Sequence, residues 1–587
     1  MCGIVGYIGK RRAAPILIDG LKRLEYRGYD SAGIAVMNDG RVEVFKRCGR
    51  VEQLEPARTL SGSIGIGHTR WATHGAPNSA NAHPHTFGEI TLVHNGIIEN
   101  AAQLRAQCLR RGESFLSETD SEVAAHVIAD FYRKTNNLLQ SLWRACQILC
   151  GSYALAVMAA GEEEIVCARR ASPLIVAKGD GEAFLASDMA LGGAKRQIFV
   201  LEDGEFARLT GENLQIYDKD LALIAREGVF LQQSEILPEK GEYRHFMRKE
   251  MDEIPEAVEN SLISPLKFEK SKLSEVLCQT YYIDIVACGT AYHSGLCAQY
   301  AFEKLLRIPT RVFLASEYRY LDPIIAPGTL TIAISQSGET ADTLAAAQLA
   351  VELGSKVLAV TNVAHSSLTR VAHLSLLTNA GREVAVAATK SFQAQLALLY
   401  SLFGEFYGRK DFSASLSKMP SLARMTMQSS ECVSAWTPYF LCAKSVFFLG
   451  RGVDRCTALE GSLKLKEITY LPSEGYAAGE LKHGTLALVD EHTPVVAVIT
   501  DEALADKTMN AVHEVSARGA RVFLVTNLPE LCHQPEVTAS VLIPKCEACF
   551  SPILSVIPLQ LLSYHLCLAL GKDPDKPRNL AKSVTVE

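Results

Sequence analysis

The chain has 587 residues, of which 48% are hydrophobic and 21% are charged, and its formal net charge is −6. This length exceeds what one hydrophobic core supports, so we expect two to four domains of an ordinary globular protein. The slight negative charge argues against a nucleic-acid-binding surface.

Cysteine usage and hydropathy indicate the compartment. Sixteen cysteines are scattered along the chain, and with no secretory signal they predict reduced thiols in a cytoplasmic protein. Cys546 and Cys549 form a single C-x-x-C pair without a second pair, so we expect neither metal binding nor redox chemistry there. The uncharged run 548–571 is the best membrane candidate, but two prolines, a glutamine and a histidine within it predict a buried core segment, and we expect no membrane partner.

The chain opens with Met1-Cys2-Gly3-Ile4-Val5-Gly6. Removal of Met1 would leave Cys2 with a thiol and a free α-amine on one residue. The ordinary pKa of such an amine is about 7.7–8.0, so a neutral fraction can accept the thiol proton. The alternative is an ordinary cysteine at the start of a first strand, because residues 4–8 are strand-like.

Short alternating apolar segments dominate the chain up to about residue 229 and predict an antiparallel, sheet-rich domain. Helical patterns cover 15–25 and 120–133, the second after the start signal Ser117-Glu118-Thr119-Asp120. The predicted strands are 34–37, 42–45, 64–67, 90–93, 153–158 and 184–186.

Polar clusters lie between these strands and are unusual for a core. His68 to Gly75 brings two histidines, an arginine and an indole together, and His94-Asn95-Gly96 follows. An Asn-Gly pair after a strand is typical of a tight turn. The functional alternative is an oxyanion hole made of the Asn95 amide and the Gly96 N–H. The histidines lack a carboxylate at metal-ligand spacing, so no metal is expected.

Five ordered motifs in this segment resemble the class II glutamine amidotransferase domain. They are Cys2 to Gly6, residues 26–33, 70–75 and 94–96, and Glu118-Thr119-Asp120. The resemblance implies a four-layer αββα sandwich over 2–229, in which Cys2 attacks the glutamine amide. It also implies these roles: Asn95 and Gly96 hold the oxyanion, Arg70 binds the substrate carboxylate, Asp120 binds its ammonium, and Thr73 and His74 line the pocket.

The polar stretch at 230–242 indicates a linker. After it, apolar strand patterns alternate with longer helical patterns, which predicts parallel α/β units. Residues 354–362 recur as 519–527, 165 positions later (519 minus 354). Residues 283–289 are similarly echoed by 446–452. Two similar lobes explain this repeat, and we place them at 243–430 and 431–572, followed by a tail at 573–587.

The first lobe contains Ser335-Gln336-Ser337-Gly338-Glu339-Thr340 between a strand at 330–334 and a helix from Ala341. Hydroxyls and free N–H groups at a helix N-terminus favour a phosphate, although an ordinary capped helix start is the alternative. The second lobe has Asp501-Glu502 at the matching position, and these carboxylates should repel a phosphate. The chain lacks a complete dinucleotide fingerprint and a Walker A motif, so no cofactor is expected.

The duplicated lobes and the serine-rich loop resemble the sugar isomerase (SIS) fold. Residues 459–467, 477–484 and 580–587 further resemble the family of glutamine-dependent enzymes that convert fructose 6-phosphate to glucosamine 6-phosphate. This resemblance covers essentially the whole chain and implies glutamine and fructose 6-phosphate as substrates and a homodimer. It also implies a sugar-phosphate site that includes Thr290, Ser335, Gln336, Ser337 and Thr340.

In that family reading Lys582 forms a Schiff base, Glu467 moves the proton between neighbouring carbons, and His483 assists ring opening. Lys464 belongs to this group because helical spacing places it beside both Glu460 and Glu467. The alternatives are a solvated tail lysine and a surface ion-pair ladder.

Two positions depart from the family pattern: Ala291 and Ala388 stand where serines are usual, and each could remove a substrate hydrogen bond. The resemblance also implies an internal passage for ammonia, with Trp71 as the candidate gate. Two other functions stay open. One is an amidotransferase that uses another phosphosugar acceptor, and the other is a non-catalytic sugar-phosphate sensor, which would not need Cys2, Glu467 and Lys582 together.

Overall fold

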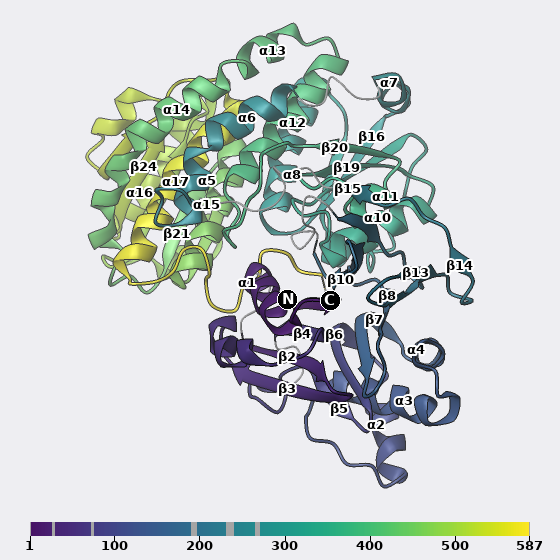
Figure 1. Cartoon of the computed structure of the whole chain (residues 1–587). Coiled ribbons are helices and arrows are strands. Elements are labelled where there is room, and N and C mark those ends of the chain that lie inside the picture. Colours follow the sequence, from purple (N-terminus) through teal and green to yellow (C-terminus); the bar gives the residue numbers. More distant parts are fainter. Residues whose placement is uncertain are drawn as a thin grey trace. The chain divides into compact units, whose positions relative to one another are not determined.

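The computed structural model describes residues 2–25, 30–71, 75–188, 196–230, 240–263 and 270–585. The chain divides into two compact units (Figure 1): Met1–Glu239 with Ser583–Glu587, and Lys240–Lys582. Each unit is described by itself.

The first unit contains two antiparallel sheets. The eight-stranded sheet has the order β15-β11-β9-β10-β1-β4-β2-β3, and the seven-stranded sheet has the order β14-β13-β12-β8-β7-β6-β5. The elements are β1 Gly3–Ile8, α1 Ala13–Leu24, β2 Ser31–Asn38, β3 Arg41–Cys48, the 3-10 segment η2 Val51–Thr59, β4 Ile64–Arg70, β5 His85–Phe87, β6 Ile90–Ile98, α2 Ala101–Arg110, α3 Asp120–Thr135, α4 Leu138–Cys146, β7 Gly151–Ala159, β8 Ile165–Arg170, β9 Ile175–Lys178, β10 Ala183–Ala186, β11 Gln197–Val200, β12 Phe206–Leu209, β13 Leu214–Tyr217, β14 Leu223–Ile224 and β15 Val229–Phe230.

Three apolar layers hold this unit together. In β1, Ile4 and Ile8 face the layer between the two sheets, whereas Val5 and Tyr7 face the layer under α1 and η2. This is the two-residue alternation of a strand that is buried on both faces. Helices α2, α3 and α4 cover the other sheet, so the predicted αββα order is confirmed.

The predicted elements of this unit are confirmed. All six strand segments fall within observed strands, and the two helical patterns are α1 and α3. The start signal works as expected: the Thr119 side chain caps α3 by accepting the Glu122 N–H at 3.3 Å. Residues 26–29 of the second motif lie outside the described residues.

The second unit contains two five-stranded parallel sheets, β17-β16-β18-β19-β20 and β22-β21-β23-β24-β25. In both, the second strand lies outside the first and the third to fifth follow on the other side, so the predicted repeat is confirmed. The elements are α5 Phe246–Asp252, α6 Ile254–Ile263, α7 Lys270–Cys278, β16 Tyr282–Ala287, α8 Gly289–Ala301, η6 Phe302–Leu306, β17 Thr310–Leu314, α9 Ala315–Tyr318, β18 Thr329–Ile334, α10 Ala341–Glu352, β19 Lys356–Thr361, α11 Ser367–Val371, β20 Leu374–Leu377, α12 Lys390–Phe406, α13 Lys410–Leu416, α14 Met419–Ser430, η7 Glu431–Tyr439, β21 Val446–Gly450, α15 Val453–Thr469, β22 Ser473–Ala477, η8 Glu480–His483, η9 Thr485–Leu488, β23 Pro494–Ile499, η10 Glu502–Leu504, α16 Ala505–Ser516, β24 Arg521–Thr526, η11 Pro529–His533, β25 Val537–Leu542, η12 Ala548–Phe550 and α17 Pro552–Ala569.

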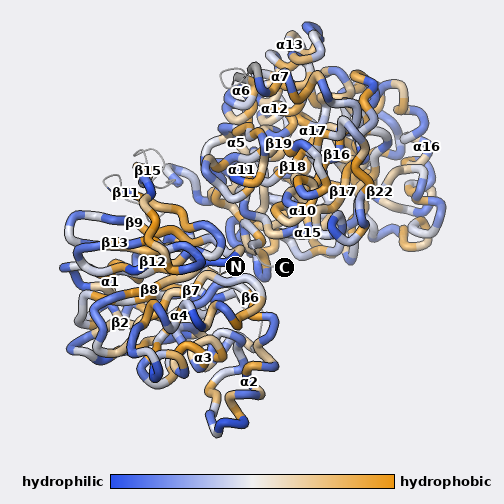
Figure 2. Tube along the Cα trace, turned by 90° about the vertical axis from the view of Figure 1, so that its right-hand side faces the viewer, coloured by the Kyte–Doolittle hydropathy of each residue, from blue (hydrophilic) through white to orange (hydrophobic). Residues whose placement is uncertain are grey.

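One continuous apolar core joins the two lobes of this unit, with residues of α8, α12, α15 and α17 in it. Figure 2 shows α12 and α17 as largely apolar segments among the other elements. Helix α17 is the uncharged run singled out in the sequence, and it is the one helix of the described residues long and apolar enough to cross a membrane. It is 83% buried within the unit, as predicted for a core segment.

The tail beyond α17 forms neither helix nor strand over residues 573–585. Asp575 anchors it, because its carboxylate accepts the Phe246 N–H at 2.9 Å and the Met247 N–H at 2.8 Å. Its own carbonyl accepts the Val386 N–H at 3.0 Å. The tail is therefore an extended arm fastened to α5. Residues 231–239 of the predicted linker lie outside the described residues.

Candidate active sites

Strand pairing places the Cys2 thiol. Gly3 pairs with Thr69 across β1 and β4, so Cys2 lies beside the residues that follow β4. The Trp71 N–H donates to Cys2 Sγ at 3.3 Å, and the thiol lies 3.6 Å from the Trp71 carbonyl oxygen. Burial raises the pKa of the Cys2 thiol, against the opposing effects of the chain's amino terminus, the Trp71 N–H and Arg70. The thiol is therefore neutral near pH 7.

Asn95 and Gly96 lie within β6, where they pair with Ala154 and Tyr153 of β7. The tight-turn alternative for this Asn-Gly pair is therefore wrong. Gly96 has φ of +128°, and a Cβ there would lie 2.0 Å from the Ser152 carbonyl oxygen, so the site requires glycine. The Asn95 amide donates to the Cys2 carbonyl at 3.1 Å, which holds it next to the thiol residue.

Two opposite charges flank the thiol. Arg70 and Asp120 both act on the pKa of Cys2. The Arg70 guanidinium donates to the carbonyls of Ala76 and Gly75 at 3.3 and 3.2 Å, and Asp120 accepts the Ile98 N–H at 2.8 Å. The structure thus gathers the predicted residues Cys2, Arg70, Trp71, Asn95, Gly96 and Asp120, whereas Thr73 and His74 lie outside the described residues.

Four histidines of this region, His68, His83, His85 and His94, are buried, although their polar clusters look unusual for a core in the sequence, and the first three lie close together. His68 and His83 lie 4.0 Å apart by ring centroids, and His83 and His85 lie 4.7 Å apart. Burial lowers the pKa of His68 to about 3 and lowers the pKa of the other two well below the ordinary value. The rings are therefore neutral, and His68 supports Asn95 through a contact of 3.1 Å to its Oδ1.

In the first lobe of the second unit, the serine-rich loop joins the carboxyl end of β18 to α10. The Ser335 hydroxyl lies 2.9 Å from that of Thr340 and accepts the Gly338 N–H at 3.1 Å. Thr340 is the N-cap residue of α10, yet its side chain makes no capping hydrogen bond. Thr340 therefore does not cap α10 with its side chain, and the loop gathers the Ser335 and Thr340 hydroxyls at a helix N-terminus, an arrangement that suits a phosphate.

The second lobe fills the equivalent place with its own carboxylate. Gly289 and Gly452 both follow the first strand of their lobe and have φ of +56° and +61°, so Asp454 corresponds to Ala291. The Asp454 carboxylate accepts the Thr500 N–H at 2.7 Å and the Asp501 N–H at 3.4 Å, as well as the Thr500 hydroxyl. Burial raises the pKa of Asp454 to about 6. Asp454 thus occupies the N–H groups at the end of β23, and the predicted repulsion of a phosphate by Asp501 and Glu502 stays a prediction.

Helix α15 carries a buried charge cluster. Lys464 is 0% exposed, and its Nζ lies 2.6 Å from Glu467 and 3.5 Å from Glu460. The helical-spacing prediction is confirmed, and the surface-ladder alternative is wrong. Thr290 and His293 of α8 contact the same Glu460 carboxylate at 3.0 and 2.7 Å. Burial raises the pKa of the Glu467 carboxyl in spite of Lys464, which makes Glu467 a stronger base than an exposed glutamate.

Lys582 is buried as well, with 5% of its side chain exposed, and forms an ion pair with the buried Glu383. The solvated-tail alternative is therefore wrong. Glu383 also accepts the Thr389 N–H at 2.9 Å and the Ser391 hydroxyl at 2.9 Å. Burial acts to raise the pKa of Glu383, but Lys582 and these donors lower it to about 2. Sequence reasoning missed Glu383, because 199 positions separate it from Lys582 and no local pattern links them.

His483 is exposed at the end of η8. Among the described residues it makes no hydrogen bond or ion pair with Glu467, Lys464 or Lys582. Its role in ring opening therefore stays a prediction.

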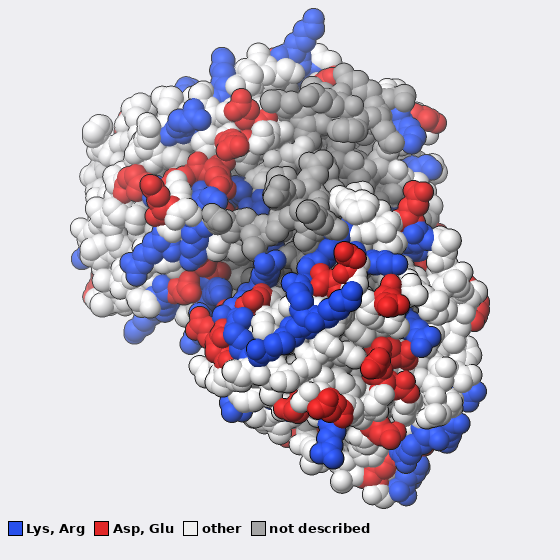
Figure 3. Space-filling model, viewed as in Figure 1, with Lys and Arg blue, Asp and Glu red and all other residues white. Residues whose placement is uncertain are grey.

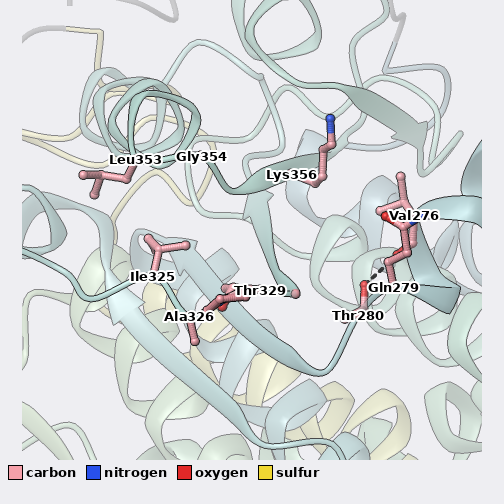
Figure 4. Close-up of a pocket in the computed structure, with 11 residues that line it drawn as sticks. Val276, Gln279, Thr280, Ile325, Ala326, Thr329, Leu353, Gly354 and Lys356 are labelled. Carbon is pink, nitrogen blue, oxygen red and sulfur yellow. Dashed lines mark hydrogen bonds between the residues drawn. The ribbon is translucent and has the colours of Figure 1, made fainter.

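Two cavities among the described residues are lined by none of these groups. Figure 4 shows a cavity of about 320 Å³ that includes Thr329 and Lys356, the first residues of β18 and β19. A second, of about 430 Å³, lies at the amino ends of β21 and β23. Ligands of open parallel sheets bind at the carboxyl ends of the strands, where the 335–340 loop lies, so neither cavity is the candidate active site.

One cluster of the described residues has the composition of a metal site: Cys108, Glu113 and His126. The positively charged Arg111 guanidinium occupies this cluster, where it donates to Cys108 Sγ at 3.2 Å and to Glu113 at 3.1 Å. Burial also raises the pKa of Cys546 and Cys549 to about 12, so both thiols of the C-x-x-C pair stay protonated at neutral pH.

Comparison with known proteins agrees with this architecture. A glutamine amidotransferase domain family matches residues 68–191, and the SIS domain family matches residues 277–404 and 439–570. A curated protein of Clostridium tetani named glutamine–fructose-6-phosphate aminotransferase (isomerizing) is 46% identical, and one of the same name from Thermus thermophilus is 44% identical. Each alignment covers 100% of both chains.

Solved structures resemble the second half. The C-terminal domain of glucosamine-fructose-6-phosphate aminotransferase from Francisella tularensis is 36% identical, with a TM-score of 0.55, and covers 58% of this chain and 100% of its own. Tagatose-6-phosphate ketose/aldose isomerase from Escherichia coli has a TM-score of 0.51 at 19% identity, covering 59% of this chain and 98% of its own. This second likeness shows the fold alone.

Proposed function

Because the chain belongs to the family of glutamine–fructose-6-phosphate aminotransferases, we propose that it transfers the amide nitrogen of glutamine to fructose 6-phosphate. The product is isomerised to glucosamine 6-phosphate, and glutamate is released. The observation that carries the proposal is that Lys464 and Lys582 are charged groups withdrawn from solvent in one unit, with the half-buried Glu467 paired to Lys464. A non-catalytic sensor would have no use for them.

The first half-reaction uses the thiol of Cys2. Burial keeps this thiol protonated, so its proton must pass to a base, and the α-amine of an N-terminal Cys2 supplies one. Sulfur then bonds to the amide carbon, and the tetrahedral intermediate expels ammonia and leaves a γ-glutamyl thioester. Water hydrolyses this thioester, which releases glutamate and restores the Cys2 thiol. Asn95 and Gly96 stabilise the oxyanion of the intermediate. Arg70 binds the substrate carboxylate, Asp120 its ammonium, and Thr73 and His74 line the pocket.

The second half-reaction takes place in the first lobe. Ser335, Gln336, Ser337 and Thr340 hold the sugar phosphate at the α10 N-terminus, with Thr290 close to the sugar. The Lys582 amine attacks the C2 carbonyl and water leaves as the imine forms. Ammonia then displaces the Lys582 amine from C2, and Glu467 moves a proton between C1 and C2. Burial raises the pKa of Glu467, and Lys464 opposes this shift. His483 assists ring opening.

Ammonia must reach the sugar without escaping into water, and we assign Trp71 as the gate because its backbone contacts the Cys2 thiol.

We also propose a cytoplasmic homodimer that binds neither nucleic acid nor a membrane. The intermingled Lys, Arg, Asp and Glu side chains on the face drawn in Figure 3 support a small-molecule enzyme. Light scattering of the purified chain tests the dimer. The domain bounds 2–229, 243–430 and 431–572, with the linker and the tail, stay proposals that limited proteolysis tests.

The decisive experiment incubates the chain with glutamine and fructose 6-phosphate and detects the products by mass. Glucosamine 6-phosphate and glutamate in equal amounts are expected. Glutamate without an amino sugar would indicate another acceptor, and no turnover of either substrate would indicate a sensor. Borohydride trapping with fructose 6-phosphate should attach the sugar to Lys582, and an adduct on another lysine would contradict the assigned mechanism.

A further inference from the structure

A second buried carboxyl group lies beside the Lys582–Glu383 pair. Glu250 of α5 is 1% exposed, and its Oε1 accepts the N–H groups of Val384 and Ala385 at 2.5 and 3.1 Å. These are the two residues that directly follow Glu383. The other oxygen, Oε2, is buried and has no hydrogen-bond partner among the described residues.

The charges around Glu250 decide its protonation state. The Lys582 ammonium is already balanced by Glu383, so an ionised Glu250 would be an uncompensated charge in a buried place, which is costly. Burial and then the charge of Glu383 raise the pKa of Glu250 to about 8, against the opposing effects of Lys582 and the two backbone donors. If Glu250 is a neutral acid, its proton lies on Oε2, because Oε1 already accepts two N–H groups.

We propose that Glu250 is a positioning residue that carries a proton at neutral pH. As a neutral acid it fixes residues 383–385 through two backbone N–H groups and leaves Lys582 with a single counter-charge. If Glu250 ionised, a second negative charge would hold the Lys582 proton more tightly and disfavour the free amine that attacks the sugar. This inference rests on the proposed function, in which Lys582 is the reactive amine.

The other charged side chains of α5, and the neighbouring Glu253 and Asp575, are paired. They are Glu253, which contacts Lys390 at 2.7 Å and Lys249 at 3.5 Å, Arg248, which contacts Asp252 at 3.1 Å and Glu431 at 2.6 Å, and Asp575, which contacts Lys240 at 3.2 Å. Lys464 also faces this region, because Glu383 acts on its pKa. Glu467 lies within the influence of Lys582 and is itself raised in pKa. A pH profile therefore has to compare variants that differ at Glu250 alone.

Glu250→Gln is the sharpest variant, because glutamine keeps an acceptor for the two N–H groups and cannot ionise. We expect its synthase kcat at pH 7 to stay within about twofold of the parent, because Glu250 is already mostly neutral there. At pH 9, one unit above the pKa, Glu250 of the parent is about 90% ionised, so the parent should fall up to about tenfold below Glu250→Gln. Glu250→Ala leaves the Val384 and Ala385 N–H groups without this acceptor, so it should lose synthase activity at every pH. All these variants should hydrolyse glutamine at the parental rate.

Two results would overturn the proposal. One is a Glu250→Gln variant as inactive at pH 7 as Glu250→Ala, which would show that a charge is needed. The other is an alkaline limb that is the same in Glu250→Gln and the parent.

Thermal unfolding gives a readout that needs no sugar substrate. The folded-state pKa of Glu250 lies above its ordinary value of about 4.3, so its contribution to stability is present below pH 4 and is lost as the pH rises to about 8. The Tm of Glu250→Gln should therefore rise relative to the parent between pH 5 and pH 8. A rise without amino-sugar synthesis would refute only the proposed function, and synthesis without a rise would refute only the role of Glu250.

Discussion

At the level of single residues, the Cys2 thiol is half-buried, and desolvation raises its pKa and keeps it protonated at neutral pH. In the part of the chain that the structure describes, its hydrogen bonds are with the Trp71 backbone. We propose that the α-amine of an N-terminal Cys2 removes the thiol proton, because it lies on the same residue.

An uncleaved N-terminal tag should therefore abolish glutamine hydrolysis, because it converts the amine of Cys2 into an amide that cannot accept a proton. The measurement is glutamate release by tagged protein, with the tag shown intact by mass spectrometry. The control is the same protein after the tag is removed to expose Cys2. Normal hydrolysis by the intact tagged protein would contradict the role of the amine.

The variant Lys582→Arg tests whether Lys582 is needed as a nucleophilic amine or only as a positive charge. Arginine can keep the buried ion pair with Glu383, so the fold should be retained, but a guanidinium keeps its proton and forms no imine. Synthase activity should fall by more than the roughly 10²–10⁴-fold typical of a lost acid–base group, while glutamine hydrolysis continues. Amino-sugar formation at near the parental rate would show that Lys582 is not the attacking amine.

At the level of elements, the two lobes have the same strand order but differ at the start of one helix. Asp454 of α15 accepts the Thr500 and Asp501 N–H groups with its carboxylate, whereas the corresponding residue of α8 is Ala291. We therefore predict one sugar-phosphate site per chain. Calorimetric titration with glucosamine 6-phosphate should give a stoichiometry of one, and Thr340→Ala in the first lobe should weaken that single site. Two equivalent sites would contradict the prediction.

The local sequence pattern was enough to predict helices and strands, and contacts between residues that are close in the sequence. The helical spacing of Glu460, Lys464 and Glu467 predicted their contacts, because residues three and four apart share a helix face. Glu383, Glu250 and Asp454 escaped prediction because their partners come from other elements, and only the folded chain brings them together. The burial of His68 was missed for the same reason, since it depends on the stacking of two sheets.

At the level of the whole molecule, the groups proposed for glutamine hydrolysis lie in the first compact unit and Lys582 in the second. The last five residues group with the first unit. The two activities should therefore respond separately to changes in the chain, and Cys2→Ala should abolish glutamine hydrolysis while phosphosugar isomerisation continues. Retained glutamine hydrolysis in Cys2→Ala would contradict the assignment of the nucleophile.

Ending the chain at Ala581 should remove synthase activity completely and leave glutamine hydrolysis measurable. The tail is an extended arm that Asp575 fastens to α5, and this anchor survives the truncation, so the second unit should stay folded. The loss follows from removal of the Lys582 amine and with it the covalent route.

The matched control is full-length Lys582→Ala, which removes the amine but keeps the last five residues. Equal glutamine hydrolysis in the two proteins would show that those five residues are dispensable for the first unit, and lower hydrolysis in the truncated chain would show that they support it. Synthase activity in either protein would refute the mechanism.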